Sequence, residues 1–170
     1  VAKADGNLDV GILGSTYLLR ALSDNGRADV AYQIASQSTQ PSWGWWLGQG
    51  ATTMWETWGT GASLNHIMFG DISAWFMEYL AGIQPDPAQP GFQHFLVKPT
   101  PVGDLTSVHA THDSPYGRIV VEWERHDGQF QLNLSVPPNS TASVWLPGDK
   151  APREVSSGVS RLSCKLPDAK

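Results

Sequence analysis

The sequence predicts an α+β chain in two parts, a helical part followed by an antiparallel β-sandwich. Helices are expected before residue 84 because apolar residues recur there at steps of three and four. Strands are expected beyond residue 90, where the apolar period changes to two. Pro85, Pro87 and Pro90 separate the two patterns and prevent a helix from continuing across them. The expected organisation is a helical domain over residues 1–84, a linker over 85–91, a sandwich over 92–147 and a polar tail over 148–170.

Three helices are expected in the first part. Residues 9–22 and 27–36 each carry an apolar stripe, and Ser23-Asp24-Asn25-Gly26 between them predicts an antiparallel helical hairpin. A third, well-buried helix is expected from Leu64 to Gly82, with Ser63 as its N-cap. Residues 41–62 have no helical period and are expected to be loop with short extended segments. Three helices leave apolar sides uncovered, so we expect something outside this sequence to complete the helical surface.

Five strands are expected in the second part, because apolar and polar residues alternate in short runs there. The run His126-Asp127-Gly128-Gln129 predicts a hairpin turn between two of them. After Pro147 the sequence becomes polar, and a frayed or disordered end is expected. The expected strands include residues 95–97, 107–110, 119–123, 130–134 and 142–146.

Composition excludes several classes of partner. The net charge is -5 and the Lys and Arg residues are scattered, so no basic stripe is present for nucleic acid. No stretch approaches the roughly 20 apolar residues that a membrane span needs. A single cysteine, Cys164, and histidines without ligand spacing predict neither a disulfide, nor a metal site, nor a cofactor. The chain begins at Val1 without a leader pattern, so we expect its natural N-terminus to be missing.

Eight tryptophans stand out in the composition, and five of them fall between residues 43 and 58. Flat indole faces stack on the C–H faces of sugars, and indole N–H groups donate hydrogen bonds to hydroxyls. Their clustering in an irregular, Gly-rich stretch favours a binding role, because loops carry function more often than cores do. Trp43 and Trp58 are the candidate sugar-binding rings, and packing in a core is the alternative for any one of these side chains.

The string GATTMWETWG, residues 50–59, contains the candidate catalytic residue, Glu56. If residues 52–58 are extended, alternation places Glu56 on the same face as Met54 and Trp58. A carboxylate beside an aromatic wall in a partly dry cleft suits a general base. The alternative is a structural carboxylate at the rim of the loop or at the cap of a neighbouring helix.

The order of motifs along residues 6–147 resembles the α-L-rhamnosidases, a family of inverting glycoside hydrolases. PSWGWWLGQGATTMWETW and SLNHIMFGDISAWFMEYLAGI look like the closing portion of the family's catalytic barrel, and GNLDVGILGSTYLLRALSDNGRADVAYQIASQ looks like the helices before it. PGFQHFLVKPTP, SPYGRIVVEW and LSVPPNSTASVWLP look like its C-terminal β-sandwich. The resemblance implies that residues 1–84 are the last helices of an (α/α)6 toroid that binds its sugar at one end.

The same resemblance implies roles for two residues. Glu56 falls on the family's general base, which activates a water, and His66 falls on a histidine that contacts rhamnose. The stretch between them is shorter than in many family members, which implies a more open aglycone side. The family's general acid lies upstream and nothing here aligns with it, so this chain alone is expected to be inactive.

Two functions follow from these observations. As an enzyme, the chain would take a terminal α-L-rhamnoside as substrate and would need the remainder of the catalytic barrel, in the same or another chain. The rival is a non-catalytic carbohydrate-binding or structural module that keeps a Trp-rich groove without the chemistry. A general-acid segment accompanying this chain would distinguish the first from the second.

Overall fold

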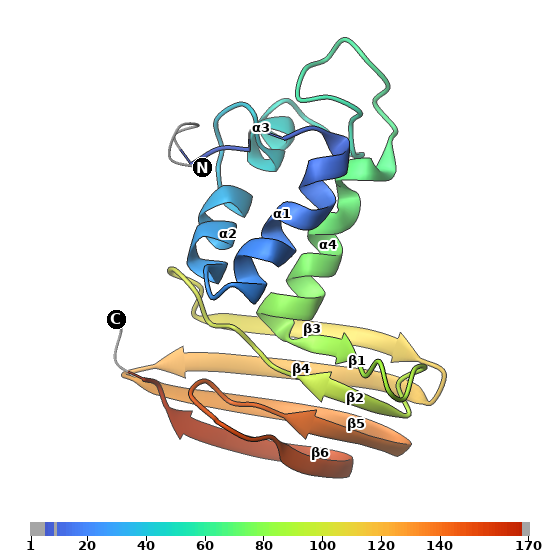
Figure 1. Cartoon of the computed structure of the whole chain (residues 1–170), viewed down its shortest axis with the longest axis vertical. Coiled ribbons are helices and arrows are strands. Elements are labelled where there is room, and N and C mark those ends of the chain that lie inside the picture. The colour runs from blue at the N-terminus through green and yellow to red at the C-terminus, as the bar shows by residue number, and fades with distance from the viewer. Residues whose placement is uncertain (1–5, 9, 168–170) are drawn as a thin grey trace. The chain divides into compact units, whose positions relative to one another are not determined.

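The computed structural model describes residues 6–8 and 10–167, which belong to two compact units, a helical unit ending at Trp75 and a β unit beginning at Phe76 (Figure 1). The boundary falls within helix, because α4 (Asp71–Trp75) leads directly into a π-helical segment, η3 (Phe76–Ala81). The expected helix start at Asp9 and residues 168–170 of the expected tail lie outside the described residues. No helix in the described part of the chain has the length and apolar character needed to cross a membrane.

The predicted helical hairpin is confirmed. Helix α1 (Ile12–Asp24) and helix α2 (Ala28–Ala35) are separated by a tight turn in which Gly26 has a φ of 73°. Glycine adopts this left-handed conformation without the steric cost that a Cβ would add. The residues that the two helices bury are Ser15 and Leu19 on α1 and Ala28, Ala31 and Ile34 on α2.

A short helix, α3 (Trp43–Gly48), lies where the sequence predicted only loop and extended segments. Ser42 is fully buried and caps this helix, since its hydroxyl accepts a 2.9 Å hydrogen bond from the backbone N–H of Trp45. Trp43 and Trp46, three residues apart, share its buried face. Six residues make fewer than two helical turns, so no period is visible in the sequence.

The third helical segment begins later than predicted. A 3-10 helix, η2 (Ile67–Gly70), comes first, and His66 rather than Ser63 is its N-cap residue. The physical reason is that residues 63–66 are used to close the preceding loop. The predicted end at Gly82 is confirmed, since that residue has a φ of 85° directly after η3.

An ion pair and a hydrogen bond between indole and hydroxyl are among the contacts that connect α1 to α4 inside the helical unit. The guanidinium of Arg20 lies 3.2 Å from the carboxylate of Asp71. The indole N–H of Trp75, whose ring is fully buried, donates a 2.9 Å hydrogen bond to the hydroxyl of Ser23. Asp71 is therefore a contact between neighbouring helices.

In the β unit, six strands form one hydrogen-bonded sheet in the order β1-β2-β5-β4-β3, and β6 pairs with β5 as well. Antiparallel pairing was expected throughout, but β2 runs parallel to β5. Strand β1 (Ile83–Pro85) was not expected and spans the last two residues of the predicted helical domain and the first residue of the predicted linker. The remaining strands are β2 (His94–Val97), β3 (Ser107–Ser114), β4 (Gly117–His126), β5 (Gln129–Val144) and β6 (Arg153–Lys165).

The predicted hairpin turn and the predicted strands over residues 95–97, 107–110 and 119–123 are confirmed, whereas residues 130–134 and 142–146, predicted as two strands, fall on the single long strand β5, which ends at Val144. Asp127 and Gly128 have φ values of 49° and 73°, and they join β4 to β5 by a tight turn with both central residues left-handed. Alternate residues of β4, namely Ile119, Val121 and Trp123, point into the core and are at most 2% exposed. The period of two in the sequence thus corresponds to one buried face of the sheet.

The expectation of a polar tail over residues 148–170 is wrong for β6, which is a regular strand paired with β5. Its composition is polar because β6 lies at the edge of the sheet, and Val155, at 7% exposed, is its one buried residue. Backbone hydrogen bonds to β5, rather than the burial of side chains, hold β6 in place. Leu162, Cys164 and Leu166 pack partly against the core and give the only apolar alternation in this stretch.

Candidate active site

The loop between α3 and η2 is closed by hydrogen bonds that link its two arms. The backbone N–H of His66 donates to the carbonyl of Met54 over 2.8 Å, and that of Glu56 donates to the carbonyl of Ser63 over 2.9 Å. The hydroxyl of Thr53 donates to the carbonyl of Leu64. These contacts pair Met54, two residues before Glu56, with His66, so both predicted site residues are anchored in one closed loop.

The carboxylate of Glu56 is half-buried and held on one side. Its Oε2 accepts a 3.1 Å hydrogen bond from the backbone N–H of Ser63, the residue whose carbonyl accepts from the Glu56 backbone. Its Oε1 accepts no hydrogen bond from the described residues. One oxygen thus fixes the orientation of the carboxylate, and the other remains able to accept a proton.

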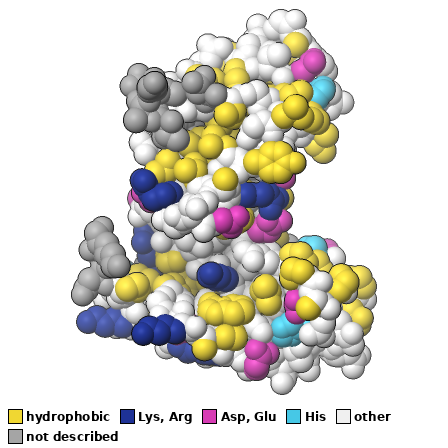
Figure 2. Space-filling model, in the orientation of Figure 1, with side chains coloured by type: hydrophobic (Ala, Val, Ile, Leu, Met, Phe, Trp, Pro, Cys, Tyr) yellow, Lys and Arg dark blue, Asp and Glu magenta, His cyan; other side chains and the backbone are white. Residues whose placement is uncertain are grey.

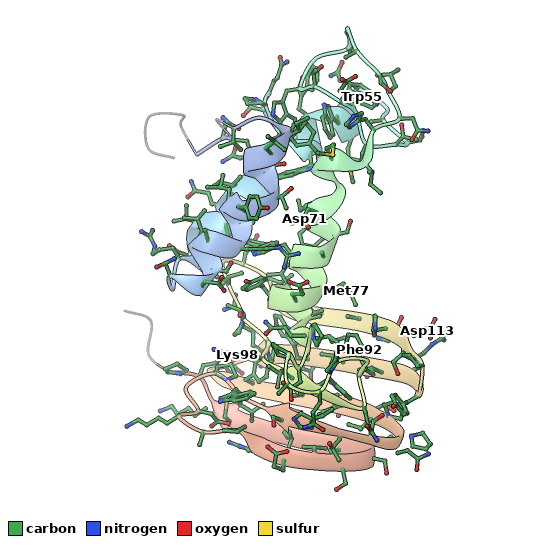
Figure 3. All side chains as sticks on the ribbon, turned by 45° about the vertical axis from the view of Figure 1, so that its right-hand side comes forward. Trp55, Asp71, Met77, Phe92, Lys98 and Asp113 are labelled. Carbon is green, nitrogen blue, oxygen red and sulfur yellow. The ribbon has the colours of Figure 1, made fainter. Side chains whose placement is uncertain are left out.

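Aromatic side chains pack beside this loop, at the end of the helical unit where Figure 3 labels Trp55. Trp46 lies at the centre of the group and is 2% exposed. Its ring stacks on Trp58 with centroids 4.5 Å apart, and it lies 5.8 Å from Trp55. Trp58 also lies 4.2 Å from Phe69, which belongs to η2. This aromatic cluster therefore connects α3, the loop and η2.

Trp43 and Trp58 differ in their exposure and in whether the indole N–H is already hydrogen-bonded. Trp43 is 7% exposed, and its indole N–H donates a 3.0 Å hydrogen bond to the carbonyl of Phe69. Trp58 is half-buried, and its Nε1 has no hydrogen-bond partner among the described residues. The prediction that both rings contact a sugar stays a prediction, and the geometry gives Trp43 the role of packing against Trp58, 5.4 Å away.

Three ring nitrogens of this region are buried without a partner among the described residues. They belong to Trp46, Trp58 and His66, the last through its Nδ1. A buried polar group that lacks a hydrogen bond costs about 1–3 kcal/mol, so such groups usually have a partner in water or a ligand. The loop and the adjoining helix α3 therefore offer two indole donors and one imidazole nitrogen within ten residues of Glu56 in sequence.

The sequence pointed to Glu56, His66, Trp43 and Trp58, and the structure places all four within or beside one loop. The sequence did not point to Trp46 or Ser63 as residues of the site. Trp46 belongs to the same run of tryptophans, so clustering was the available signal. Ser63 acts through its backbone N–H, for which the sequence contains no signal. Within residues 6–8 and 10–167, no three His, Cys, Asp or Glu side chains gather as a metal site would require.

Two family models match the chain. Residues 1–80 match the bacterial alpha-L-rhamnosidase 6 hairpin glycosidase domain, and residues 82–161 match the bacterial alpha-L-rhamnosidase C-terminal domain. The division between the two matches falls at the end of η3, close to where the helical unit gives way to the β unit.

Individual relatives lead to the same family. An alpha-L-rhamnosidase of Streptomyces avermitilis is 40% identical over 90% of this chain, which spans 16% of that relative's length. The crystal structure of a Streptomyces avermitilis alpha-L-rhamnosidase complexed with L-rhamnose superposes with a TM-score of 0.89 at 35% identity, over 96% of this chain and 19% of that one. The native enzyme from Aspergillus terreus superposes with a TM-score of 0.90 at 30% identity, over 99% of this chain and 21% of that one. The two matched domains together account for almost the whole sequence, and the chain therefore belongs to the α-L-rhamnosidase family.

Proposed function

We propose that this chain forms part of a glycoside hydrolase that cleaves terminal α-L-rhamnosides with inversion, and that Glu56 is the general base. The observation that carries the proposal is the carboxylate of Glu56, which is held through one oxygen only, in the same closed loop as Trp58 and His66, whose ring nitrogens lack partners among the described residues. The relative whose structure was solved with L-rhamnose supports the choice of sugar.

The proposed chemistry assigns one proton transfer to Glu56. Its free carboxylate oxygen takes a proton from a water molecule while that water attacks the anomeric carbon from the face opposite the leaving group. A general acid protonates the departing glycosidic oxygen. Inverting enzymes hold the two carboxyl groups roughly 6.5–9.5 Å apart to admit the water. A segment outside this chain supplies the acid, so the chain alone lacks hydrolytic activity.

We propose that His66 and Trp58 bind the sugar. The imidazole Nδ1 of His66 hydrogen-bonds a hydroxyl of the rhamnose, and the indole N–H of Trp58 donates to another. Trp43 packs edge-to-face against Trp58 and so helps to hold the Trp58 ring in place. These contacts orient the anomeric carbon toward the water that Glu56 activates.

In the proposed architecture, the helices that end with η3 at Ala81 are the last of an (α/α)6 toroid, and the strands from β1 onward form a β-sandwich, with residues 86–91 as the connection between β1 and β2. The remainder of the toroid covers helical surface that is open here. On α1, Leu13 is 72% exposed and Tyr17, one turn later, is 70% exposed, while Ile67 of η2 is 83% exposed. Figure 2 shows apolar side chains at the surface of the helical unit. Apolar groups in such numbers mark a surface that another part of a protein covers.

This surface predicts how the isolated chain behaves. We expect it to bind a hydrophobic dye such as anilinonaphthalene sulfonate, or to self-associate, because Leu13 and Tyr17 lie exposed on one face of α1. Dye fluorescence and light scattering measure both effects. The double substitution Leu13→Lys, Tyr17→Lys should reduce dye binding while circular dichroism stays unchanged. A monodisperse, dye-silent wild-type chain would contradict a covered surface.

A chimera tests the proposed function. This chain replaces the matching segment of the Streptomyces avermitilis relative, to which it is 40% identical. We expect the chimera to hydrolyse p-nitrophenyl α-L-rhamnoside and to release β-L-rhamnose first, whereas this chain alone does neither. A folded chimera that binds L-rhamnose but shows no hydrolysis would favour the non-catalytic binding module instead.

A further inference from the structure

The β unit contains a hollow of about 410 Å³ that lies outside the candidate active site. Its walls come from residues 98–101, 145–149 and 166–167, together with Arg125. Ligand sites typically have volumes of about 300–1,000 Å³, so the hollow has room for one sugar ring. All the residues around it belong to the β unit, and the proposal below does not depend on the role of Glu56.

The walls of the hollow are fixed by backbone hydrogen bonds and by proline rings. The N–H of Trp145 donates to Val97 over 2.9 Å, and the N–H of Leu166 donates to Gly128 over 2.8 Å. The turn from Leu146 to Asp149 is closed in both directions, by a 2.9 Å backbone bond and by a 3.1 Å bond to the Asp149 carboxylate. Pro99, Pro101, Pro147 and Pro167 stiffen the same walls. A ligand would find the hollow already formed, which lowers the entropic cost of binding.

Trp145 is half-buried and lines this hollow. No aromatic ring among the described residues lies against it, and its indole N–H has no hydrogen-bond partner there. Trp123 shows the contrasting structural role, because it is 2% exposed and its N–H donates over 2.8 Å to the carbonyl of Leu80. Trp145 thus presents a flat apolar face and a free donor on the wall of a hollow, the combination that stacks on a sugar ring.

The charged groups of the hollow leave a surplus of positive charge. The ammonium group of Lys98, labelled in Figure 3, is exposed and pairs with no acid among the described residues. Arg125 adds a second cation, whose Nη2 donates to the carbonyls of Val102 and Gly103. The carboxylate of Asp149 is already paired with Arg153, 3.0 Å away. An anionic group entering the hollow would therefore meet Lys98 and Arg125 without an opposing free acid.

We propose that this hollow binds a sugar residue that carries an acidic group, as in an acidic polysaccharide. The C–H face of the sugar packs on the indole of Trp145, and its carboxylate faces the ammonium of Lys98. Such a site gives the chain a contact with a polymeric substrate or cell-wall glycan that is separate from the site of hydrolysis.

Affinity electrophoresis of the 170-residue chain tests this site. Native gels containing sodium polygalacturonate should retard the chain, whereas gels containing dextran or poly-L-glutamate should not. Trp145→Ala and Lys98→Ala should each weaken the retardation about tenfold, since each removes one of the two proposed contacts with the sugar. Trp145→Phe keeps a ring and should lose less than Trp145→Ala. Lys150→Ala removes an exposed lysine that does not line the hollow and should change nothing.

The outcomes separate a sugar site from simple charge attraction. Equal retardation by poly-L-glutamate would overturn the proposal in favour of non-specific attraction, and equal retardation by dextran would overturn the acidic preference. No retardation by polygalacturonate would also overturn it. Lys98 is exposed, so its substitution should leave the thermal midpoint unchanged. Loss of retardation in Lys98→Ala at an unchanged midpoint therefore supports the site even if Trp145→Ala unfolds.

Discussion

Glu56→Gln in the active chimera is expected to lower kcat for p-nitrophenyl α-L-rhamnoside by about 10²–10⁴-fold, the usual contribution of a general base. The amide can keep the hydrogen bond from Ser63 to its oxygen, so the loop should stay closed. It cannot accept a proton from water at neutral pH. The binding of free L-rhamnose, measured by calorimetry, should therefore change little while turnover falls.

Two other substitutions serve as references for this result. Glu124→Gln makes the same chemical change on an exposed residue of β4 and should leave kcat unaffected. His66→Ala should instead raise KM, because it removes a ring that orients the sugar rather than the acceptor of the proton. If Glu56→Gln retained turnover within about threefold of the parent, far from the range for a lost base, the carboxylate would be structural.

Gly82→Ala is expected to destabilise the chain by about 2–5 kcal/mol. Gly82 has a φ of 85°, which an L side chain adopts only with strain. A Cβ there would also lie closer than 3.0 Å to backbone atoms of Lys98 and Pro99. The Lys98 N–H donates a 2.9 Å hydrogen bond to the Gly82 carbonyl, so the two backbones cannot separate freely. Urea unfolding followed by circular dichroism measures the free energy of unfolding.

Gly128→Ala is the control that separates the strain of a positive φ from the steric clash with Lys98 and Pro99. Gly128 has a φ of 73°, yet no atom lies within 4 Å of the position its Cβ would take. Its substitution should therefore cost only about 1–2 kcal/mol, the strain of the left-handed conformation. Equal losses at the two positions would show that packing against Lys98 and Pro99 contributes nothing.

The sequence predicted those elements in which the regular spacing of apolar residues continues over several helical turns or along a strand. The hairpin of α1 and α2 was predicted because its apolar stripes are long, and the turn at Asp127-Gly128 because both residues tolerate a positive φ. Helix α3 was missed because six residues show no period. Strand β6 was missed because it is an edge strand held by backbone hydrogen bonds to β5. Backbone hydrogen bonds place little constraint on the type of its side chains, so no apolar pattern marks it in the sequence.

The candidate site was predicted in part for the same kind of reason. Residue type and spacing singled out Glu56 and Trp58, since carboxylate and indole groups have recognisable chemistry, whereas His66 was singled out by the resemblance to the α-L-rhamnosidases. The hydrogen bond from Ser63 to Glu56 is made by the backbone, which carries no sequence signal. Which tryptophans use their N–H groups, as Trp43 does, depends on packing between α3 and η2 and was visible only in three dimensions.

The parallel pairing of β2 with β5 has a consequence for how the β unit assembles. His94 of β2 meets Thr141 of β5 across 47 residues of chain, whereas β3, β4 and β5 each pair with the strand that follows them in sequence. Closing a long loop costs entropy before its contacts repay it, so we expect the consecutive hairpins to form first and the parallel pair last. During synthesis, the edge of β2 that faces β5 stays unpaired until β5 has left the ribosome, and it is in that interval that the unit is most exposed to wrong pairing.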